Sequence, residues 1–209
     1  MPESFLILTQ VPNRTLDAYP PYRSPRSSPP GPVGMPPCPV LVILAGLPAT
    51  GKTTIGRALA RETGAVHVRV DTIEQAIVRV GAGTHPLGPV GYAVAYALTE
   101  DYLRQGHTVI AESVNPLAIT REAWREVARS AAVEYLDVEV VCSDPVEHER
   151  RATTRTVDIP DLRLPTWADI RQREYEEWDR DRLVLDTARY SLAECVARIR
   201  PLISDPRNS

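Results

Sequence analysis

The stretch that decides the fold is Val40-Leu41-Val42-Ile43-Leu44-Ala45 together with the loop that follows it, Gly46-Leu47-Pro48-Ala49-Thr50-Gly51-Lys52-Thr53. The first six residues are all apolar, which predicts a strand buried on both faces. The next eight match G-x-x-x-x-G-K-[ST] at every defined position. Glycines there let backbone N–H groups point at phosphate oxygens, and a helix that begins near Lys52 adds its partial positive charge. The stretch therefore predicts a phosphate-binding loop between a strand and a helix.

The lysine of this loop also stands out in the composition. Of the 24 basic residues, 23 are arginine, and Lys52 is the one lysine. An ammonium group fits where the larger, planar guanidinium does not, so a single lysine at this position supports the motif. We expect Lys52 to reach the β- and γ-phosphates of ATP, and the Thr53 hydroxyl to bind Mg²⁺. The predicted nucleotide-binding residues are Gly46, Leu47, Pro48, Ala49, Thr50, Gly51, Lys52, Thr53 and Thr54.

From Val40 onward, strand-like and helix-like segments alternate, which is typical of a parallel sheet covered on both faces. The predicted strands are Val40–Ala45, Ala65–Val70, His107–Ala111, Val138–Cys142 and Arg182–Leu185. The predicted helices span 52–63, 72–80, 92–104, 120–131 and 167–178, and two more begin after the capping residues Asp144 and Ser191. We therefore expect a three-layer α/β domain with a five-stranded, mainly parallel sheet.

Proline is concentrated at the N-terminus. Eleven of the 20 prolines fall within residues 1–39, where no periodic hydrophobic pattern is sustained. Such a segment does not bury enough apolar surface to offset its ordering entropy, so we predict that it is disordered. The predicted folded domain covers 40–204, a short tail covers 205–209, and Met35 is a possible alternative start.

Charge, cysteine content and hydrophobicity exclude several classes of protein. A net charge of −3 argues against nucleic-acid binding through a broadly basic surface. The three cysteines are too few and too scattered for a disulfide framework or a zinc site. No apolar run approaches the ~18 residues that a membrane span requires. We therefore expect a cytoplasmic protein with no membrane partner.

The loop and the segments after it resemble a known group of proteins. Val40–Thr54, with the chain as far as about Leu202, is similar to the small P-loop kinases and phosphotransferases, such as gluconate kinase, adenylylsulfate kinase and chloramphenicol phosphotransferase. It also resembles bacterial proteins labelled as AAA-family ATPases. The resemblance implies the P-loop NTPase fold with a helical lid. It also implies a transfer of phosphate from ATP, with Mg²⁺, to a small-molecule hydroxyl.

Two acidic residues stand where this resemblance places functional carboxylates. Asp71 comes 19 residues after Lys52, where similar kinases carry an acid at a strand end that faces the acceptor hydroxyl. Capping of the following helix is a second possible role for Asp71. Glu112 follows the strand His107–Ala111 in the pattern of a Walker B site, and we expect it to hold Mg²⁺ through a water. Similar kinases more often have aspartate there, and a solvated strand end is the alternative.

Arg151 and Arg155 follow the fourth predicted strand, where similar kinases place catalytic lid arginines. Residues four apart on a helix share a face, so their like charges repel, and a bound phosphate would remove the repulsion. The alternative is an ion pair between Glu147 and Arg151 at the same spacing. Arg150 is expected on the surface.

Other polar and aromatic residues carry weaker signals. Ser113 and Asn115 follow the third predicted strand and could bind substrate or nucleotide at the carboxyl edge of the sheet. The region of His85, Tyr92 and Tyr96 lies beside the acceptor acid in similar folds and could line the acceptor site, although surface or core positions are commoner for such residues.

Three further residues are assigned to packing. Trp167 and Trp178 flank a stretch with Arg171 and Arg173, but nearby acidic residues cancel the positive charge, so packing is favoured over nucleic-acid binding. Cys142 is predicted to be a small buried hydrophobe.

These observations favour a phosphotransferase with a small-molecule acceptor. One alternative is a kinase of nucleotides or of polynucleotide ends, and another is a switch whose ATP state controls a partner. The acid at Asp71 and the two lid arginines favour transfer, and no residue is evident that would position a water for hydrolysis.

Overall fold

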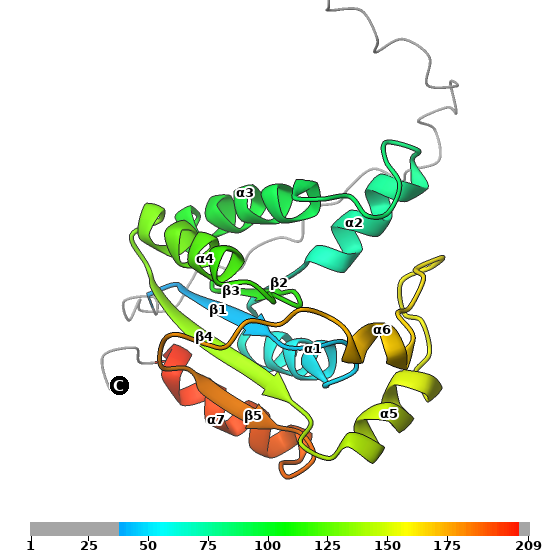
Figure 1. Cartoon of the computed structure of the whole chain (residues 1–209). Coiled ribbons are helices and arrows are strands. Elements are labelled where there is room, and N and C mark those ends of the chain that lie inside the picture. The colour runs from blue at the N-terminus through cyan, green and yellow to red at the C-terminus, as the bar shows by residue number, and fades with distance from the viewer. Residues whose placement is uncertain (1–37, 205–209) are drawn as a thin grey trace, which may run out of the picture. The chain divides into compact units, whose positions relative to one another are not determined.

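The structure is a computed structural model in which residues 38–204 are described. The predictions for the proline-rich segment 1–39, except for its last two residues, and for the tail 205–209 lie outside the described residues, as does Met35. Within the described part, Figure 1 shows a central sheet with helices on both sides. This is the three-layer arrangement that the alternation of segments predicts.

Five parallel strands form the sheet. They are β1 (Val40–Ala45), β2 (Val66–Arg69), β3 (Val109–Glu112), β4 (Glu134–Val141) and β5 (Leu183–Asp186). Their order is β2-β3-β1-β4-β5, and each neighbouring pair is parallel. The predicted five-stranded sheet is confirmed, although β4 begins at Glu134 rather than Val138 because its first residues pair with β1.

The helices cover the two faces of the sheet. They are α1 (Lys52–Thr63), α2 (Val70–Arg79), α3 (Val90–Arg104), α4 (Ala118–Ser130), α5 (Pro145–Thr154), α6 (Trp167–Arg171) and α7 (Leu192–Ser204). Figure 1 shows α1 and α7 on one side, with α3 and α4 on the other. The short α5 and α6 lie beyond the carboxyl end of β4. Within residues 38–204, no helix combines the length and the hydropathy needed to cross a membrane.

The central strand shows how both faces of the sheet are sealed. All six residues of β1 are buried, each with an exposed fraction of 1% or less. Val40, Val42 and Leu44 pack with residues of α1 and α7, whereas Leu41 and Ile43 pack with residues of α3 and α4. Side chains alternate between the faces of a strand. Burial on both faces is therefore the reason why this strand is a continuous apolar run.

The helix predicted over 167–178 is wrong in its length, because α6 stops at Arg171 and the chain is irregular from there to β5. Arg121 of α4 is fully buried and donates to the carbonyl oxygens of Glu176 (3.0 Å) and Glu177 (3.3 Å). The backbone N–H of Glu176 donates to the carbonyl oxygen of Pro116 (2.9 Å), whereas in a continuous helix it would donate to the carbonyl four residues earlier. These hydrogen bonds to residues far away in the sequence replace the helical ones that the local pattern predicts after Arg171.

The placement of Arg155 on the same helix as Arg151 is also wrong. α5 ends at Thr154, and Arg155 has an extended backbone with φ −64° and ψ 141°. Thr153 and Thr154 close the helix by donating their hydroxyls back to main-chain carbonyls. Threonine is a poor helix former for this reason and because of its branched Cβ. The two arginines therefore do not share a helix face.

The junction of β2 and α2 corrects the prediction for Asp71. β2 ends at Arg69 and α2 begins at Val70, so Asp71 lies in the first turn of the helix rather than at the strand end. The N-cap residue is Arg69, and no side chain caps the helix. The capping role for Asp71 is therefore wrong. By contrast, the predicted caps at Asp144 and Ser191 are both confirmed.

The strand order reverses beside β1, since the chain first builds β2 and β3 on one side and then β4 and β5 on the other. In open parallel sheets, ligands bind at the carboxyl ends of strands at such a point. The loops that follow β1 and β3 both leave the sheet there.

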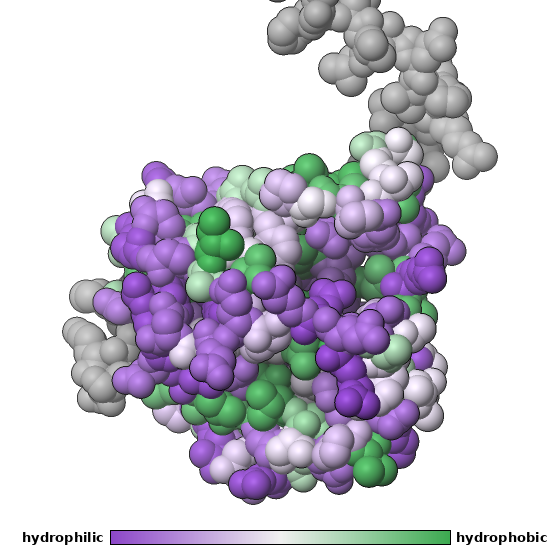
Figure 2. All heavy atoms as spheres, viewed as in Figure 1, coloured by the Kyte–Doolittle hydropathy of each residue, from purple (hydrophilic) through white to green (hydrophobic). Residues whose placement is uncertain are grey.

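Figure 2 shows mostly hydrophilic residues over the viewed face, with smaller groups of hydrophobic ones among them.

Candidate active site

The phosphate loop curls between β1 and α1 as the motif predicts. Gly46 (φ 139°) and Gly51 (φ 107°) both have positive φ, which glycine adopts without strain. A Cβ at Gly46 would lie 2.2 Å from the carbonyl oxygen of Val140 on β4, so no larger residue fits. Gly51 is the N-cap of α1, which brings the unpaired N–H groups of the helix start to the loop.

Side chains of the loop are held by its own backbone. Lys52 Nζ and Thr50 Oγ1 each donate to the carbonyl oxygen of Leu47, at 2.9 Å in both cases. Lys52 is only 8% exposed. Burial lowers the pKa of Lys52, and the nearby carboxylates of Glu112 and Asp71 oppose the shift. Because the ammonium group is poorly solvated, its attraction for a phosphate is screened less than it would be in water.

Glu112, the last residue of β3, joins the loop to the edge of the sheet. Thr53 donates its hydroxyl to Glu112 Oε1, and His67 Nε2 lies 2.8 Å from Glu112 Oε2. Burial disfavours the charged carboxylate, but the hydrogen bonds from His67 and Thr53 and the charge of Lys52 outweigh it, so the pKa of Glu112 lies below its usual value. Glu112 is 4% exposed, and the alternative of a solvated strand end is therefore wrong.

The oxygens of Thr53 and Glu112 suit a magnesium ion. Mg²⁺ prefers oxygen ligands, keeps several waters, and is commonly held by one or two protein groups together with substrate phosphates. The structure brings a hydroxyl and an ionised carboxylate into contact beside the phosphate loop. The residues present thus fit a magnesium ion that is shared with the phosphates of a nucleotide.

A cavity of about 1100 Å³ opens beside the loop, and we call it the nucleotide cavity. Its lining carries an excess of basic over acidic side chains. The basic members are Lys52, Arg57, Arg69, His85, Arg151, Arg155, Arg163 and Arg173. The acidic members are Asp71, Glu74, Glu112, Asp158 and Asp169. Positive charge in a concave site raises the local concentration of an anion such as a triphosphate.

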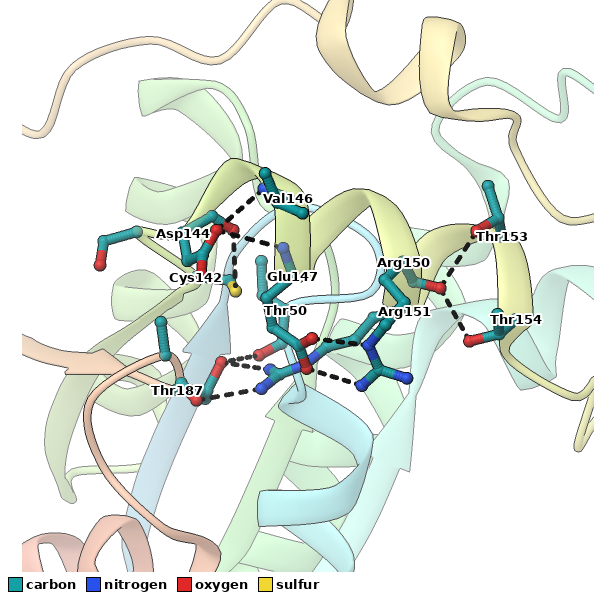
Figure 3. A network of polar contacts seen from close by, with 12 residues as sticks. Thr50, Cys142, Asp144, Val146, Glu147, Arg150, Arg151, Thr153, Thr154 and Thr187 are labelled. Carbon is teal, nitrogen blue, oxygen red and sulfur yellow. Dashed lines mark hydrogen bonds and ion pairs between the residues drawn. The ribbon is translucent and has the colours of Figure 1, made fainter.

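Two residues, Glu147 and Thr187, hold the guanidinium group of Arg151 through hydrogen bonds, as Figure 3 shows. Its Nε donates to Glu147 (2.7 Å), which confirms the alternative ion pair. Its Nη1 donates to Thr187 Oγ1 (2.7 Å), and that hydroxyl lies 2.8 Å from the carbonyl oxygen of Thr50 in the loop. The neighbouring Arg150 is exposed, as predicted, and pairs with Glu147. Arg151 therefore ties α5 to the phosphate loop.

Arg155 differs from Arg151 although both line the nucleotide cavity. Among the described residues, Arg155 forms no ion pair, and its buried Nε has no hydrogen-bond partner. Burial lowers the pKa of Arg155, and the charge of Asp71 opposes this shift. An unpaired guanidinium in the cavity is better placed to bind a phosphate than one already bonded to a carboxylate.

A second cavity of about 620 Å³ adjoins the first, and we call it the acceptor cavity after the use that is proposed for it below. Four residues line both cavities: Asp71, Glu74, Val114 and Arg173. Asp71 and Glu74 lie three residues apart on α2, so their side chains are neighbours on the surface of the helix. Burial, with the charge of Asp71 as a smaller cause, raises the pKa of Glu74.

The loop after β3 forms one wall of the acceptor cavity. Ser113 lines the cavity and is 4% exposed, and its hydroxyl lies near that of Tyr92 without a hydrogen bond of good geometry. The backbone N–H of Asn115 donates to the Tyr92 hydroxyl (3.2 Å). Both side-chain polar atoms of Asn115, which is fully buried, have no partner among the described residues. Polar groups are thus left unsatisfied on this side of the site.

The weaker candidates divide between the two cavities and the core. His85 lines the nucleotide cavity, and Tyr92 and Tyr96 line the acceptor cavity. Tyr96 also packs edge-on against Trp124, with ring centroids 4.5 Å apart. Cys142 is half-buried rather than fully buried, because it follows the last residue of β4.

The two tryptophans pack against other side chains, as predicted. Trp167 meets the ring of His148 edge-on, with centroids 5.0 Å apart. The guanidinium of Arg121 lies 4.6 Å from the centroid of the Trp178 ring.

The chain matches a known protein family over most of its length. A family model described as an AAA domain matches residues 41–193, the span that carries the phosphate loop, Glu112 and both cavities. The chain belongs to the AAA domain family. A comparison with curated protein sequences gives no match.

Solved structures share the fold of this AAA domain. A candidate kinase from Chloroflexus aurantiacus j-10-fl is 20% identical over 80% of this chain and 97% of its own, with a TM-score of 0.63. The APS kinase CysC of Mycobacterium tuberculosis, in complex with AMPPNP and APS, is 19% identical over 81% of this chain and 100% of its own, with a TM-score of 0.57. A gluconokinase from Sinorhizobium meliloti 1021 is 18% identical over 79% and 94%, with a TM-score of 0.55. The predicted P-loop kinase fold is therefore confirmed.

Three residues of the site in this AAA domain were not predicted from the sequence: Thr187, Glu74 and His67, which contacts Glu112. Thr187 follows β5 and connects Arg151 to the loop, and no motif marks it. Glu74 shares both cavities with Asp71, and its spacing of three residues on one helix is a signal that could have found it.

Proposed function

We propose that the protein transfers the γ-phosphoryl group of ATP to the hydroxyl group of a small molecule, with Mg²⁺ bound. The observation that carries the proposal is that Asp71 lines two adjoining cavities. Residues of the phosphate loop line the first cavity, and none of them lines the second. A protein that only hydrolyses ATP needs the first cavity alone. A phosphotransferase needs a second place, for the acceptor, within reach of the γ-phosphate.

On the nucleotide side, positive charge gathers where the transferred group would lie. Lys52 and the unpaired Arg155 line this cavity and would stabilise the charge on the phosphoryl oxygens. Thr53 and Glu112 would hold Mg²⁺, which supplies neutralisation of phosphate charge when bound. His67 holds the second oxygen of Glu112 and so fixes the orientation of that carboxylate.

On the acceptor side, Asp71 would orient the hydroxyl and take its proton. The acceptor oxygen forms a bond to the γ-phosphorus while the bond from that phosphorus to the bridging oxygen of ADP breaks. The hydroxyl proton passes to the Asp71 carboxylate. Glu74, whose pKa is raised, is the second carboxylate within the same junction and the next candidate for this proton.

The proposal is tested by incubating the protein with ATP, Mg²⁺ and a library of small alcohols, and by detecting phosphorylated products by mass spectrometry. We expect product only with an acceptor, and none with Lys52→Ala. ATP hydrolysis at the same rate with and without every acceptor would contradict the proposal and indicate a switch. Phosphorylation of oligonucleotide ends instead of small alcohols would indicate the polynucleotide kinase.

A further inference from the structure

We infer that the acceptor is an uncharged or cationic alcohol with an apolar body, and that this body occupies the acceptor cavity while its hydroxyl lies at Asp71. The inference rests on the proposed phosphoryl transfer and adds the chemical class of the substrate. Its grounds are the shape, the lining and the charge of the acceptor cavity.

The acceptor cavity is bounded by α2, α3, α4 and the loop after β3. Its volume of about 620 Å³ lies within the range that holds small organic ligands. Apolar and aromatic side chains dominate its lining, among them Tyr92, Tyr96, Val114, Leu117 and Ile119. Burying an apolar surface against such a wall favours binding, because that surface is removed from water. A polyhydroxylated acceptor would instead lose hydrogen bonds to water on the same wall.

The two tyrosines give the cavity a rigid aromatic wall. Their ring centroids lie 5.9 Å apart, and Tyr96 is backed by the fully buried Trp124. Burial raises the pKa of both Tyr92 and Tyr96, so both phenols are neutral at physiological pH. The wall therefore offers aromatic surface without charge, which suits an aryl or alkyl group.

The charged side chains of the acceptor cavity argue against an anionic acceptor. Three charged residues line it: the acidic Asp71 and Glu74, and the basic Arg173. The two carboxylates lie at the junction with the nucleotide cavity, where the γ-phosphate adds further negative charge. A carboxylate or phosphate on the acceptor would be repelled there, and Arg173 is the one basic lining residue that could offset the repulsion.

One buried polar group on the wall indicates that the acceptor carries a second polar atom. The Ser113 hydroxyl lines the cavity and has no hydrogen bond of good geometry within the described chain. A buried hydroxyl that lacks a good hydrogen bond is stabilised when a ligand supplies a partner, because its desolvation is then compensated. A second oxygen or nitrogen on the apolar body of the acceptor would serve as that partner.

The experiment compares matched pairs of acceptors. One set holds neutral aryl alkanols with a second oxygen on the ring, such as 2-(4-methoxyphenyl)ethanol, the second holds alkanols of the same length with a carboxylate on the ring, and the third is D-gluconate. We expect kcat/KM for phosphate transfer from ATP to be at least tenfold higher for the neutral member of each pair. Equal or better transfer to the carboxylated members or to gluconate would overturn the inference and leave the proposed function standing.

A pair of variants places the acceptor in the cavity. Ala93 on α3 lines the acceptor cavity, whereas Ala97, one turn further on and also exposed, does not. Ala93→Trp should fill the cavity and lower kcat/KM for the neutral alcohols at least tenfold, with the Kd of ATP changed less than twofold. Ala97→Trp should leave both values within twofold. An unaffected Ala93→Trp would overturn the inference.

Two additions keep the result decisive. Ile119→Asp is a second variant that charges the wall without disturbing the core, because Ile119 is 75% exposed, and it should act in the same direction as Ala93→Trp. If no compound in any set accepts phosphate, the wider library of small alcohols decides the proposed function, and ligand-observed NMR with the AMPPNP-bound protein tests the cavity alone. Binding of neutral alkanols that Ala93→Trp abolishes would uphold the occupant, and no binding would overturn it.

Discussion

The two cavities that meet at Asp71 are built in different ways. In the nucleotide cavity the polar side chains of the phosphate loop are already partnered: Lys52 and Thr50 bond to a loop carbonyl, and Thr53 bonds to Glu112. Arg155, which also lines this cavity, is left without an ion pair in the described chain. In the wall of the acceptor cavity, the hydroxyl of Ser113 lies near that of Tyr92 but forms no hydrogen bond of good geometry among the described residues. The phosphate loop is thus held in shape by hydrogen bonds within one continuous stretch, whereas the wall of the acceptor cavity is assembled from separate elements.

The proposed ligands of the two cavities would account for this difference. A nucleotide triphosphate presents the same oxygens to every phosphate loop, so one continuous stretch, Gly46 to Thr53, can serve it. An acceptor varies in shape and charge, and its cavity draws residues from α2, α3, α4 and the loop after β3. The largest expected effects of substitution therefore lie on the nucleotide side, and the effects on specificity lie on the acceptor side.

The largest effect is expected for Lys52→Ala, which removes the ammonium group from the nucleotide cavity. Phosphotransfer should fall by roughly 10³-fold or more, because preorganised charge at the transferred group is the main source of catalysis. Lys52→Arg should fail as well, since the guanidinium is too broad for this buried position. Steady-state kinetics and circular dichroism together check the result, and more than about a tenth of wild-type turnover in a folded Lys52→Ala protein would refute it.

A second substitution, Asp71→Asn, tests the junction of the two cavities. Transfer should fall by about 10²-fold, the usual contribution of a positioned acid–base group, while ATP affinity stays within a few-fold. Because Asp71 makes no helix cap, the melting temperature should not change. Glu74→Gln is the matched control three residues further on. If only Glu74→Gln lowers transfer, the proton goes to Glu74 instead.

The arginines of the nucleotide cavity offer a matched pair. Arg155→Ala should lower kcat by about 10- to 100-fold, because a hydrogen bond to a charged group contributes roughly 1.5–3 kcal/mol. Arg151→Ala should mainly lower the melting temperature, because Arg151 bonds to Glu147 and Thr187. Parallel measurements of kcat and thermal unfolding separate the two. An Arg155→Ala protein with normal kcat and a lowered melting temperature would reverse the assignment.

The smallest effect concerns acid stability. The pKa of Glu112 is lower in the folded protein than its ordinary value of 4.5, so its ionised form stabilises the fold. This contribution is fully present above pH 4.5 and is lost as the pH falls through the folded-state pKa. Glu112→Gln should therefore flatten the loss of stability below pH 4.5, as measured by urea unfolding at several pH values. Parallel pH profiles for the two proteins would contradict this.

Much of the nucleotide side could be predicted from the sequence because its signals are local. The apolar run of β1, the glycines and Lys52 lie within one stretch, and steric limits at Gly46 and Gly51 admit little else. The caps at Asp144 and Ser191 were also predictable, since each depends on residues within one helical turn.

Other features depend on residues far apart in the sequence. The segment after α6 is irregular where its backbone bonds to residues more than fifty positions earlier: the N–H of Glu176 donates to the Pro116 carbonyl, and Arg121 donates to the carbonyls of Glu176 and Glu177. The different surroundings of Arg151 and Arg155 arise because α5 ends between them and because Thr187, from the end of β5, reaches the phosphate loop. No periodicity in the local sequence records such contacts.

The sequence by itself determined the phosphate loop, the parallel sheet and the acid at the end of β3, because each follows from backbone sterics or from the period of burial along one segment. The tertiary structure alone decided the acceptor side. It placed Asp71 and Glu74 between two cavities and brought aromatic rings of α3 against the loop after β3. The physical reason is that a cavity is a property of several packed elements, and its charge and shape exist only once those elements have met.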